Sequence, residues 1–347
     1  MKPIIFGCSG PTLSDHERAF FAKHQPAGFI LFARNIESPE QVSELTQSLR
    51  SAVGREDVLI GIDQEGGRVQ RMNEPHWRKY PPMKLFGDCA RQDIVQAETA
   101  LEATVRLMSD DLRRVGINMN CAPVLDLPIE GSDDIIGDRA FSDDLRIVRE
   151  LGRVVLYSMP SYGVLPVIKH MPGHGRALVD SHHELPRVKN AYQELVESDF
   201  YPFRKLRHSP FAMTAHIVFE AVDPERPATL SPRVIQQVIR HEIGFDGLLM
   251  TDDLSMEALS GDFGARAQAA LKAGCDLLLH CNGDMSEMKA IAEAVQEADD
   301  TLKRTIADLV RQVRVTEPRD RKELEHDFAF QMQGLKAKTK DADYWKS

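Results

Sequence analysis

The chain has 347 residues, of which 42% are hydrophobic and 28% are charged, which is typical of a globular protein with a full core. Its 43 basic and 53 acidic side chains give a net charge of −10 at pH 7, which argues against nucleic acid or an anionic membrane as the main partner. No stretch approaches the roughly 18 apolar residues that a membrane span needs.

Short apolar runs alternate along the chain with longer segments of helical periodicity. The predicted strands are Pro3–Gly7, Gly28–Phe32, Val58–Asp63, Ile117–Pro123, Leu165–His170, Phe211–His216, Gly247–Asp252 and Asp276–His280. The helical segments include Pro39–Ala52, Asp93–Val115, Asp143–Met159, Gln193–Leu206 and Ser231–Glu242. Eight such βαβ units favour an α/β protein with a single-domain (β/α)8 barrel. An open doubly wound sheet is less favoured, because the FGCSGP after the first strand lacks the Gly-x-Gly-x-x-Gly pattern.

Two further features bound the domain organisation and the compartment. We expect the barrel to occupy residues 1–315, and the charge-rich residues 316–347 to form a surface helix and tail. The five cysteines are widely spaced, odd in number and without a Cys-x-x-Cys pair, which is typical of a reducing compartment. The first apolar run is too short for a secretory signal, so we expect a cytoplasmic protein, and a monomer.

Charged or imidazole side chains follow six of the predicted strands. They are Asp63, Asp126, Lys169 with His170, His216, Asp252 with Asp253, and His280. In a (β/α)8 barrel the catalytic groups come from the carboxyl ends of the strands and from the loops that follow them. This placement therefore predicts an enzyme.

The densest group of ionisable side chains lies between Val167 and Pro186, which read VIKHMPGHGRALVDSHHELP. Such side chains on a glycine-rich loop at a strand end can place proton-transfer groups near a substrate. Lys169 at the rim of a strand would be costly unless it met an anion or a polar ligand. We therefore interpret the segment as an active-site loop, in which His174 serves either the Pro-Gly-His-Gly turn or the substrate. His183 is expected to be a solvated loop residue.

Several strand-end residues also have a purely structural interpretation. His216 and His280 could be hydrogen-bonded structural groups. Asp253 is expected to cap, or to lie in the first turn of, a helix that begins at Leu254. Asp252, still on the strand, is the better candidate for chemistry.

A metal centre or a serine nucleophile is less favoured by the spacing. The histidines lack metal-ligand spacing and would have to converge through the fold alone, and no Gly-x-Ser-x-Gly elbow is present. We expect no metal and no cofactor, with metal-dependent hydrolysis as a weaker alternative.

These motifs together resemble glycoside hydrolase family 3, and within it the bacterial β-N-acetylhexosaminidases. The matching segments are KHMPGHG from Lys169, TDDLSM from Thr251, DQEGGRVQR from Asp63, GDRAF from Gly137, MTAH from Met213 and ILFARN from Ile30. The resemblance runs from about residue 5 to about residue 300. Met171 stands where the family usually has Phe, which affects only local packing.

The resemblance implies a retaining exo-β-N-acetylglucosaminidase that acts on a small glycan, a GlcNAc-1,6-anhydro-muropeptide released from the cell wall. It points to Asp252 as the nucleophile, His182 as the acid/base and Asp180 as the group that orients His182. The implied substrate-binding residues are Asp63, Arg71, Arg139, Lys169 and His170. A His acid/base is chemically reasonable, because imidazole gives and takes a proton near neutral pH and a carboxylate can fix its tautomer.

Two alternatives remain at this point. A glycoside phosphorylase could use the same site, because a neutral His repels phosphate less than a carboxylate would. A catalytically silent sugar-binding protein could share the scaffold, although Asp180, His182 and Asp252 argue against it.

Overall fold

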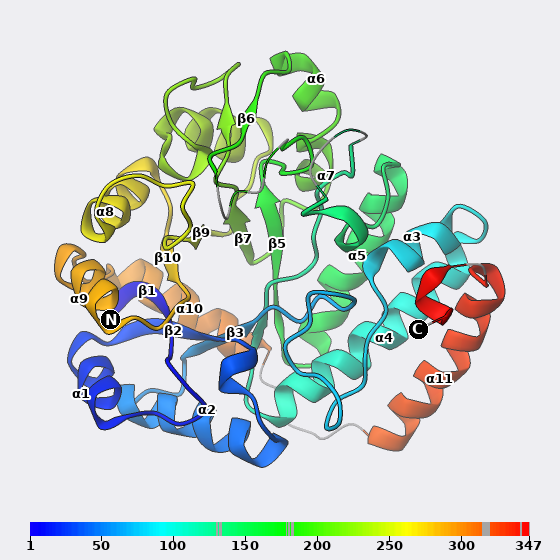
Figure 1. The fold of residues 1–347 in the computed structure, drawn as a ribbon, viewed down its shortest axis with the longest axis horizontal. Helices are drawn as coiled ribbons and strands as arrows, with labels where there is room; N and C mark the ends of the chain where they lie inside the picture. Colours follow the sequence, from blue (N-terminus) through cyan, green and yellow to red (C-terminus); the bar gives the residue numbers. More distant parts are fainter. Residues whose placement is uncertain are drawn as a thin grey trace.

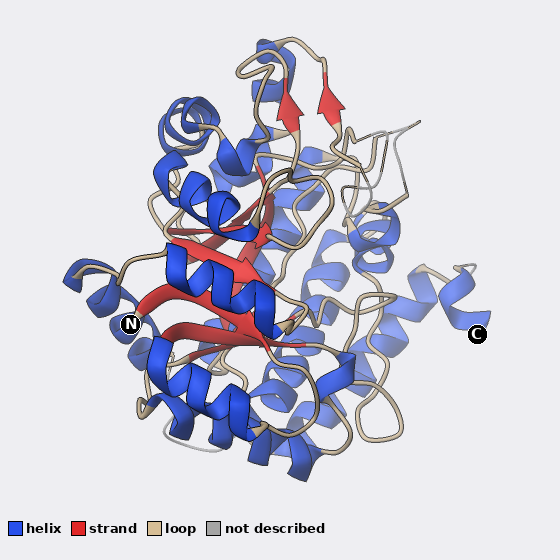
Figure 2. Ribbon diagram, turned by 60° about the vertical axis from the view of Figure 1, so that its left-hand side comes forward, coloured by secondary structure: helices blue, strands red, loops and turns tan. Residues whose placement is uncertain are grey.

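The computed structural model describes residues 1–129, 131, 134–177, 179, 181, 184–313, 320–340 and 342–346. Its centre is a closed barrel of parallel strands that helices surround (Figure 2). The barrel strands are β1 (Lys2–Gly7), β2 (Pro26–Leu31), β3 (Leu59–Ile62), β4 (Met119–Asn120), β5 (Leu165–Met171), β7 (Phe211–Thr214), β9 (Leu248–Asp253) and β10 (Leu277–His280). They follow the order β1-β10-β9-β7-β5-β4-β3-β2, and β1 closes the barrel by pairing Ile4 with Leu278 of β10. The predicted (β/α)8 barrel is confirmed.

The helices cover the outside of this barrel (Figure 1). They are α1 (Asp15–His24), α2 (Pro39–Val53), α3 (Met83–Ala90), α4 (Ile94–Arg114), α5 (Leu145–Ser161), the π-helix η4 (Val234–Glu242), α8 (Phe263–Ala273), α9 (Met285–Ala294) and α10 (Asp300–Gln312). Short polar side chains begin most of them: Ser38, Asp93 and Asp262, for example, each accept a hydrogen bond from a first-turn amide.

Side chains that alternate along each strand point to opposite faces of the barrel wall and form two apolar layers. Ile5 and Val167 belong to a cluster inside the barrel, whereas Phe6 and Ile168 pack with helix residues such as Leu45. The period of two therefore places one set of side chains in the barrel and the other beneath the helices.

The prediction of one continuous helix over Gln193–Leu206 is wrong. The segment Gln193–Leu206 forms two short helices, α6 (Tyr192–Glu197) and α7 (Phe200–Lys205), with a break at Ser198. The cause is Pro202, which has no N–H to bond the Ser198 carbonyl and whose ring would clash with that carbonyl in a continuous helix.

A small parallel sheet outside the barrel was not predicted. It joins β6 (Arg187–Val188) to β8 (Val218–Phe219) and lies apart from the barrel strands (Figure 2). An ion pair of 2.7 Å between Arg187 and Glu220 adds to it. The sheet ties the chain that follows β5 to the chain that follows β7, beyond the carboxyl ends of both strands.

The C-terminal helix α11 (Arg321–Lys338) packs along α4 (Figure 1), and a short turn of helix, η5 (Asp343–Lys346), follows it. Leu335 is fully buried, and Arg321 contacts Asp111 at 2.6 Å. The expected boundary after residue 315 falls in residues 314–319, outside the described residues, so it stays a prediction. Among the helices of the described chain, none has the length and apolarity to cross a membrane.

Candidate active site

A cavity of about 370 Å³ opens at the carboxyl ends of the barrel strands. All six strand-end or loop residues that the sequence singled out for binding or attack line it. They are Asp63, Arg71, Arg139, Lys169, His170 and Asp252. Residues far apart in the sequence thus meet because parallel strands bring their carboxyl ends to one rim.

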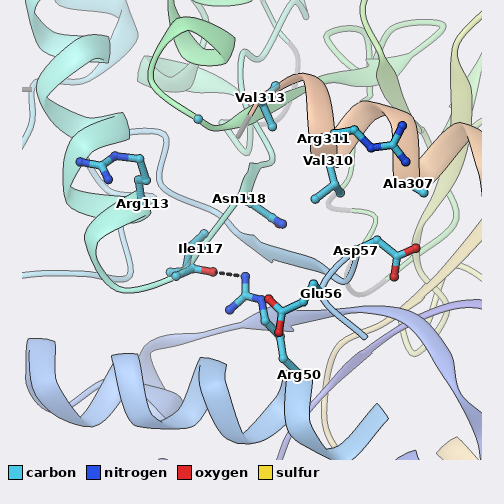
Figure 3. Close-up of a pocket in the computed structure, with 12 residues that line it drawn as sticks. Arg50, Glu56, Asp57, Arg113, Ile117, Asn118, Ala307, Val310, Arg311 and Val313 are labelled. Carbon is cyan, nitrogen blue, oxygen red and sulfur yellow. Dashed lines mark hydrogen bonds between the residues drawn. The ribbon is translucent and has the colours of Figure 1, made fainter. Parts of the chain in front are cut away.

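A second cavity, of about 550 Å³, lies at the opposite end of the barrel (Figure 3). Its lining includes Asp57, Asn118 and Gly163, which come just before β3, β4 and β5. Arg50 points into this region and donates to the Gly116 carbonyl at 2.7 Å. The amino ends of barrel strands serve stability, so this cavity is not the candidate active site.

The loop after β3 is shaped by two glycines and a buried glutamine. Gly66 and Gly67 have φ angles of 99° and 58°, and a Cβ on Gly66 would lie 2.4 Å from the Pro81 carbonyl oxygen. The side chain of Gln64 accepts from the amides of Arg71 and Met72. This turn places the side chains on either side of Gln64 in the cavity.

Lys169 lies at the centre of a buried ion network. Its Nζ contacts Asp63 at 2.9 Å and Glu65 at 2.6 Å, and Lys169 is only 2% exposed. Arg139 binds both oxygens of Glu65 at 2.9 Å, in the bidentate geometry typical of strong pairs. Burial alone would raise the pKa of the Glu65 carboxyl, but Arg139 and Lys169 hold that pKa below its usual value. The network is therefore charged at neutral pH.

Asp63 also bonds to Arg71, whose Nη2 lies 3.2 Å from the carboxylate. The pKa of Asp63 lies well below its usual value, because Lys169 and Arg71 outweigh the effect of burial. The Arg71 Nε atom is buried without a hydrogen-bond partner among the described residues. This orphaned donor beside the cavity is consistent with a ligand oxygen there.

Asp126 orients His170 from behind. Its carboxylate lies 2.7 Å from His170 Nδ1 and accepts from the backbone amides of His170 and His174. Because an ionised carboxylate only accepts hydrogen bonds, Nδ1 carries a proton and the Nε2 edge of the ring is turned away from Asp126. Asp126 thus fixes both the Nδ1 proton and the direction of the His170 ring.

Asp252, at the end of β9, has a fixed carboxylate. The backbone amide of Asp253 donates to Asp252 Oδ1 at 2.8 Å. Burial alone would raise the pKa of Asp252, but His170, this amide and Lys169 bring it below the usual value. Asp252 is therefore an anion with a defined rotamer at the cavity wall, as attack on carbon requires.

The described part of the following loop closes another side of the cavity. His174 and Ser181 both line it, and His174 Nε2 lies 3.0 Å from Ser181 Oγ. Burial lowers the pKa of His174 to about 4, so its ring is neutral. Of the two roles expected for His174, its hydrogen bond to Ser181 supports the one in the loop. Asp180 and His182, the expected acid/base pair, lie outside the described residues, as does His183.

Three further predicted residues occupy structural positions around Asp252. Asp253 was expected to cap a helix, but residues 254–258 form turns, and its carboxylate accepts instead from the Ser255 and Cys281 amides. His216 is fully buried and bonds the Asp253 carbonyl at 3.0 Å. His280 is also fully buried, and its ring forms T-shaped contacts with the rings of Phe6 and Phe263.

Two residues of the site were not predicted as such. Glu65 lies in the Asp-Gln-Glu-Gly-Gly motif and Asp126 follows a predicted strand, so the sequence held a signal for both. Their roles depend on partners 74 and 44 residues away, Arg139 and His170. In the part of the chain that the structure describes, no group of three or more His, Cys, Asp or Glu side chains could hold a metal ion.

A closed parallel barrel with a deep charged cavity at the carboxyl ends of its strands defines a (β/α)8 enzyme. The profile of the glycosyl hydrolase family 3 N-terminal domain matches residues 7–315. The chain belongs to glycosyl hydrolase family 3 and is a glycoside hydrolase.

Individual relatives extend this similarity. The chain is 42% identical over 286 residues to a protein of Alkalilimnicola ehrlichii named beta-hexosaminidase, covering 81% of each chain. It is 38% identical over 284 residues to a beta-hexosaminidase of Bordetella avium, covering 81% of this chain and 80% of the relative. The crystal structure of NagZ from Neisseria gonorrhoeae in complex with N-trifluoroacetyl-D-glucosamine superposes with a TM-score of 0.85, at 29% identity, over 96% of this chain and 98% of that one.

Proposed function

We propose that this family 3 hydrolase is a retaining exo-β-N-acetylglucosaminidase that removes terminal GlcNAc from 1,6-anhydro-muropeptides through a covalent glycosyl–Asp252 ester. The observation that carries the proposal is the Asp252 carboxylate, fixed by the Asp253 amide in the cavity that holds the Lys169 network. The beta-hexosaminidase relatives and the Neisseria structure with a GlcNAc analogue support the sugar. The proposal includes a cytoplasmic monomer that acts in cell-wall recycling.

The reaction needs two groups on opposite sides of the glycosidic bond. An Asp252 oxygen attacks the anomeric carbon, while the bond to the leaving oxygen breaks and His182, oriented by Asp180, gives that oxygen its proton. A water molecule then attacks the anomeric carbon of the ester and passes a proton to His182. This second step releases GlcNAc with retained configuration and restores the Asp252 carboxylate.

The remaining cavity residues would hold the terminal sugar. Asp63 accepts hydrogen bonds from sugar hydroxyls, while Lys169, Arg71 and Arg139 donate to sugar oxygens, and His170 hydrogen-bonds a sugar hydroxyl through Nε2. Because the charged groups are already paired with one another, they are pre-organised before the substrate enters. The cavity volume of about 370 Å³ suits a ligand the size of a sugar.

The test of the activity compares GlcNAc release from a GlcNAc-anhydromuramyl peptide with release from chitobiose, each with and without inorganic phosphate. We expect faster release from the anhydromuramyl peptide and free GlcNAc in both buffers. If GlcNAc-1-phosphate forms in the phosphate buffer, the enzyme is a phosphorylase and the proposed hydrolase activity is wrong. If neither substrate is turned over, the catalytically silent sugar-binding protein is the remaining interpretation.

Replacing His182 by alanine is expected to slow substrates with poor leaving groups by about 10² to 10⁴-fold. An aryl glycoside whose phenol needs no proton should lose far less, because only the first kind of leaving group requires a general acid. The measurement is kcat/KM for chitobiose and for a dinitrophenyl N-acetyl-β-glucosaminide. His183→Ala, one residue along, is the matched control and should change neither value appreciably. Equal losses for both substrates in His182→Ala would exclude it as the general acid.

A further inference from the structure

His216 has a buried position behind the cavity wall. It follows β7 by two residues, is fully buried and is not among the described residues that line the cavity. Its Nε2 lies 3.0 Å from the Asp253 carbonyl oxygen and its Nδ1 lies 2.7 Å from Thr229 Oγ1. A carbonyl oxygen can only accept, so Nε2 carries the proton and Nδ1 accepts from the threonine hydroxyl.

Two threonine hydroxyls can satisfy the tautomer that the Asp253 carbonyl selects. Thr229 Oγ1 lies 2.8 Å from Thr214 Oγ1 and 3.2 Å from the Ala215 carbonyl. The single Thr229 proton has two acceptors in reach, His216 Nδ1 at 2.7 Å and the Ala215 carbonyl at 3.2 Å, and the unprotonated Nδ1 takes it at the shorter distance. Thr214 can then donate to Thr229. Burial lowers the pKa of His216, which agrees with a neutral ring. The hydrogen bonds therefore run in one direction, from Thr214 through Thr229 and His216 to the Asp253 carbonyl.

The far end of this chain of hydrogen bonds is the residue that holds Asp252. Asp253 accepts from His216 through its carbonyl and donates through its amide to Asp252 Oδ1 at 2.8 Å. Its carboxylate is bound by the Ser255 hydroxyl at 2.6 Å and the Cys281 amide at 3.1 Å. Every polar group of Asp253 thus has a role in fixing its position. The carbonyl also accepts from the Met256 amide at 3.2 Å, and only the His216 contact comes from the segment that follows β7.

We propose that His216 is a positioning residue for the nucleophile: its Nε2–H holds the Asp253 carbonyl, which keeps the Asp253 amide on the Asp252 carboxylate. This proposal rests on the proposed function of Asp252. His216 touches no substrate and transfers no proton. It acts by restricting the backbone at the end of β9, so that Asp252 keeps the rotamer for attack.

The test uses two amide replacements that retain different halves of the imidazole. His216→Gln places an N–H donor where Nε2 lies. His216→Asn places its amide where Nδ1 lies and leaves the Asp253 carbonyl with only the Met256 amide, at 3.2 Å, as a donor. For a dinitrophenyl N-acetyl-β-glucosaminide we expect His216→Asn to lose about tenfold in kcat/KM, the equivalent of one hydrogen bond, and His216→Gln to recover most of the rate. The Ki of GlcNAc as a competitive inhibitor should stay the same in both variants.

A second pair of variants acts on the same chain of hydrogen bonds without changing the histidine. Thr229→Val removes the donor to Nδ1 and should lower kcat/KM as His216→Asn does. Thr229→Ser, the matched control, keeps the hydroxyl and should recover most of the rate. If the His216 variants do not fold, as judged by thermal unfolding, the Thr229 pair decides by the same criterion.

Three outcomes are distinguishable. Equal losses in the Gln and Asn variants, and likewise in the Val and Ser variants, would overturn the positioning role and leave His216 as a packing residue. A loss that appears in the Ki of GlcNAc would also overturn it, because the effect would then lie in binding. Failure of the wild-type chain to hydrolyse the aryl glycoside, or undiminished activity in Asp252→Ala, would instead contradict the proposed function.

Discussion

Replacing Asp252 by alanine is expected to lower kcat/KM for an aryl N-acetyl-β-glucosaminide on the order of 10⁴-fold or more. Without this carboxylate no glycosyl ester can form, and the oxygens of Asp63 and Glu65 are already bound to Lys169. The fold should persist, because Asp252 lies at the cavity wall and its loss leaves no buried cation unpaired. The measurements are steady-state kinetics and thermal unfolding.

The matched control for Asp252 is Asp300→Ala, which removes a carboxylate whose side chain is 95% exposed on α10. It should leave both activity and the unfolding temperature near those of the wild type. Mass spectrometry of wild-type enzyme quenched during turnover adds a direct test, because the peptide with Asp252 should gain one N-acetylhexosaminyl group. Near-normal activity of Asp252→Ala would exclude it as the nucleophile.

Replacing Lys169 by methionine is expected to lower the free energy of unfolding by about 3 kcal/mol at neutral pH and to impair substrate binding. The variant keeps the volume but removes the cation between Asp63 and Glu65, which contact Lys169 at 2.9 and 2.6 Å. Two buried carboxylates would then face each other with only their arginine partners. Chemical denaturation gives the stability, and the KM for the aryl glycoside gives the effect on binding.

The destabilisation by Lys169→Met should depend on pH. The pKa values of Asp63 and Glu65 are below their ordinary values, so in the wild type they stabilise the fold above about pH 4 and lose that effect as the pH falls through their folded values. The pKa of Lys169 is raised, so its contribution is complete below about pH 10 and is lost only as the pH rises further. The difference between wild type and variant should therefore be largest between about pH 5 and 9 and shrink in acid.

Lys84→Met is the matched control for Lys169→Met. Lys84 contacts Asp88 at 2.7 Å, a distance similar to those of Lys169, but its side chain is 55% exposed. Solvent screens this pair, so its loss should change the free energy of unfolding by less than about 1 kcal/mol. If the two variants were equally stable, burial of the Lys169 network would have no energetic consequence and the prediction would fail.

The barrel could be predicted from the sequence because each strand is a short apolar run, and six of the eight are followed by a charged or imidazole side chain. The small β6–β8 sheet and the break between α6 and α7 could not be predicted, because each depends on only a few residues. β6 and β8 have two residues each, too few to show a period, and their pairing joins segments 31 residues apart (Arg187 with Val218). The split between α6 and α7 depends on Pro202, whose effect falls four residues earlier, at Ser198.

The site was predictable to the extent that it depends on strand ends. Asp63, Lys169 and Asp252 were candidates because they lie at the ends of apolar runs, and they meet in one cavity. Their individual roles came from the resemblance. The partners that orient them are set by tertiary contacts: nothing local to Asp126 indicates that it binds His170, and nothing local to His216 indicates the Asp253 carbonyl. The assignments of Asp180 and His182 depend on the resemblance and stay predictions.

The pairing of β1 with β10 also bears on how the protein is made. A chain emerging from the ribosome releases β1 first, yet the second neighbour of β1 is the last strand of the barrel. Until residue 280 has emerged, β1 and β9 each have one unpaired edge, which is a hazard for association with other chains. The cavity is closed only by that final strand, since Leu279 and Cys281 form part of its wall. A chain cut short before β10 would therefore lack an active site as well as a stable fold.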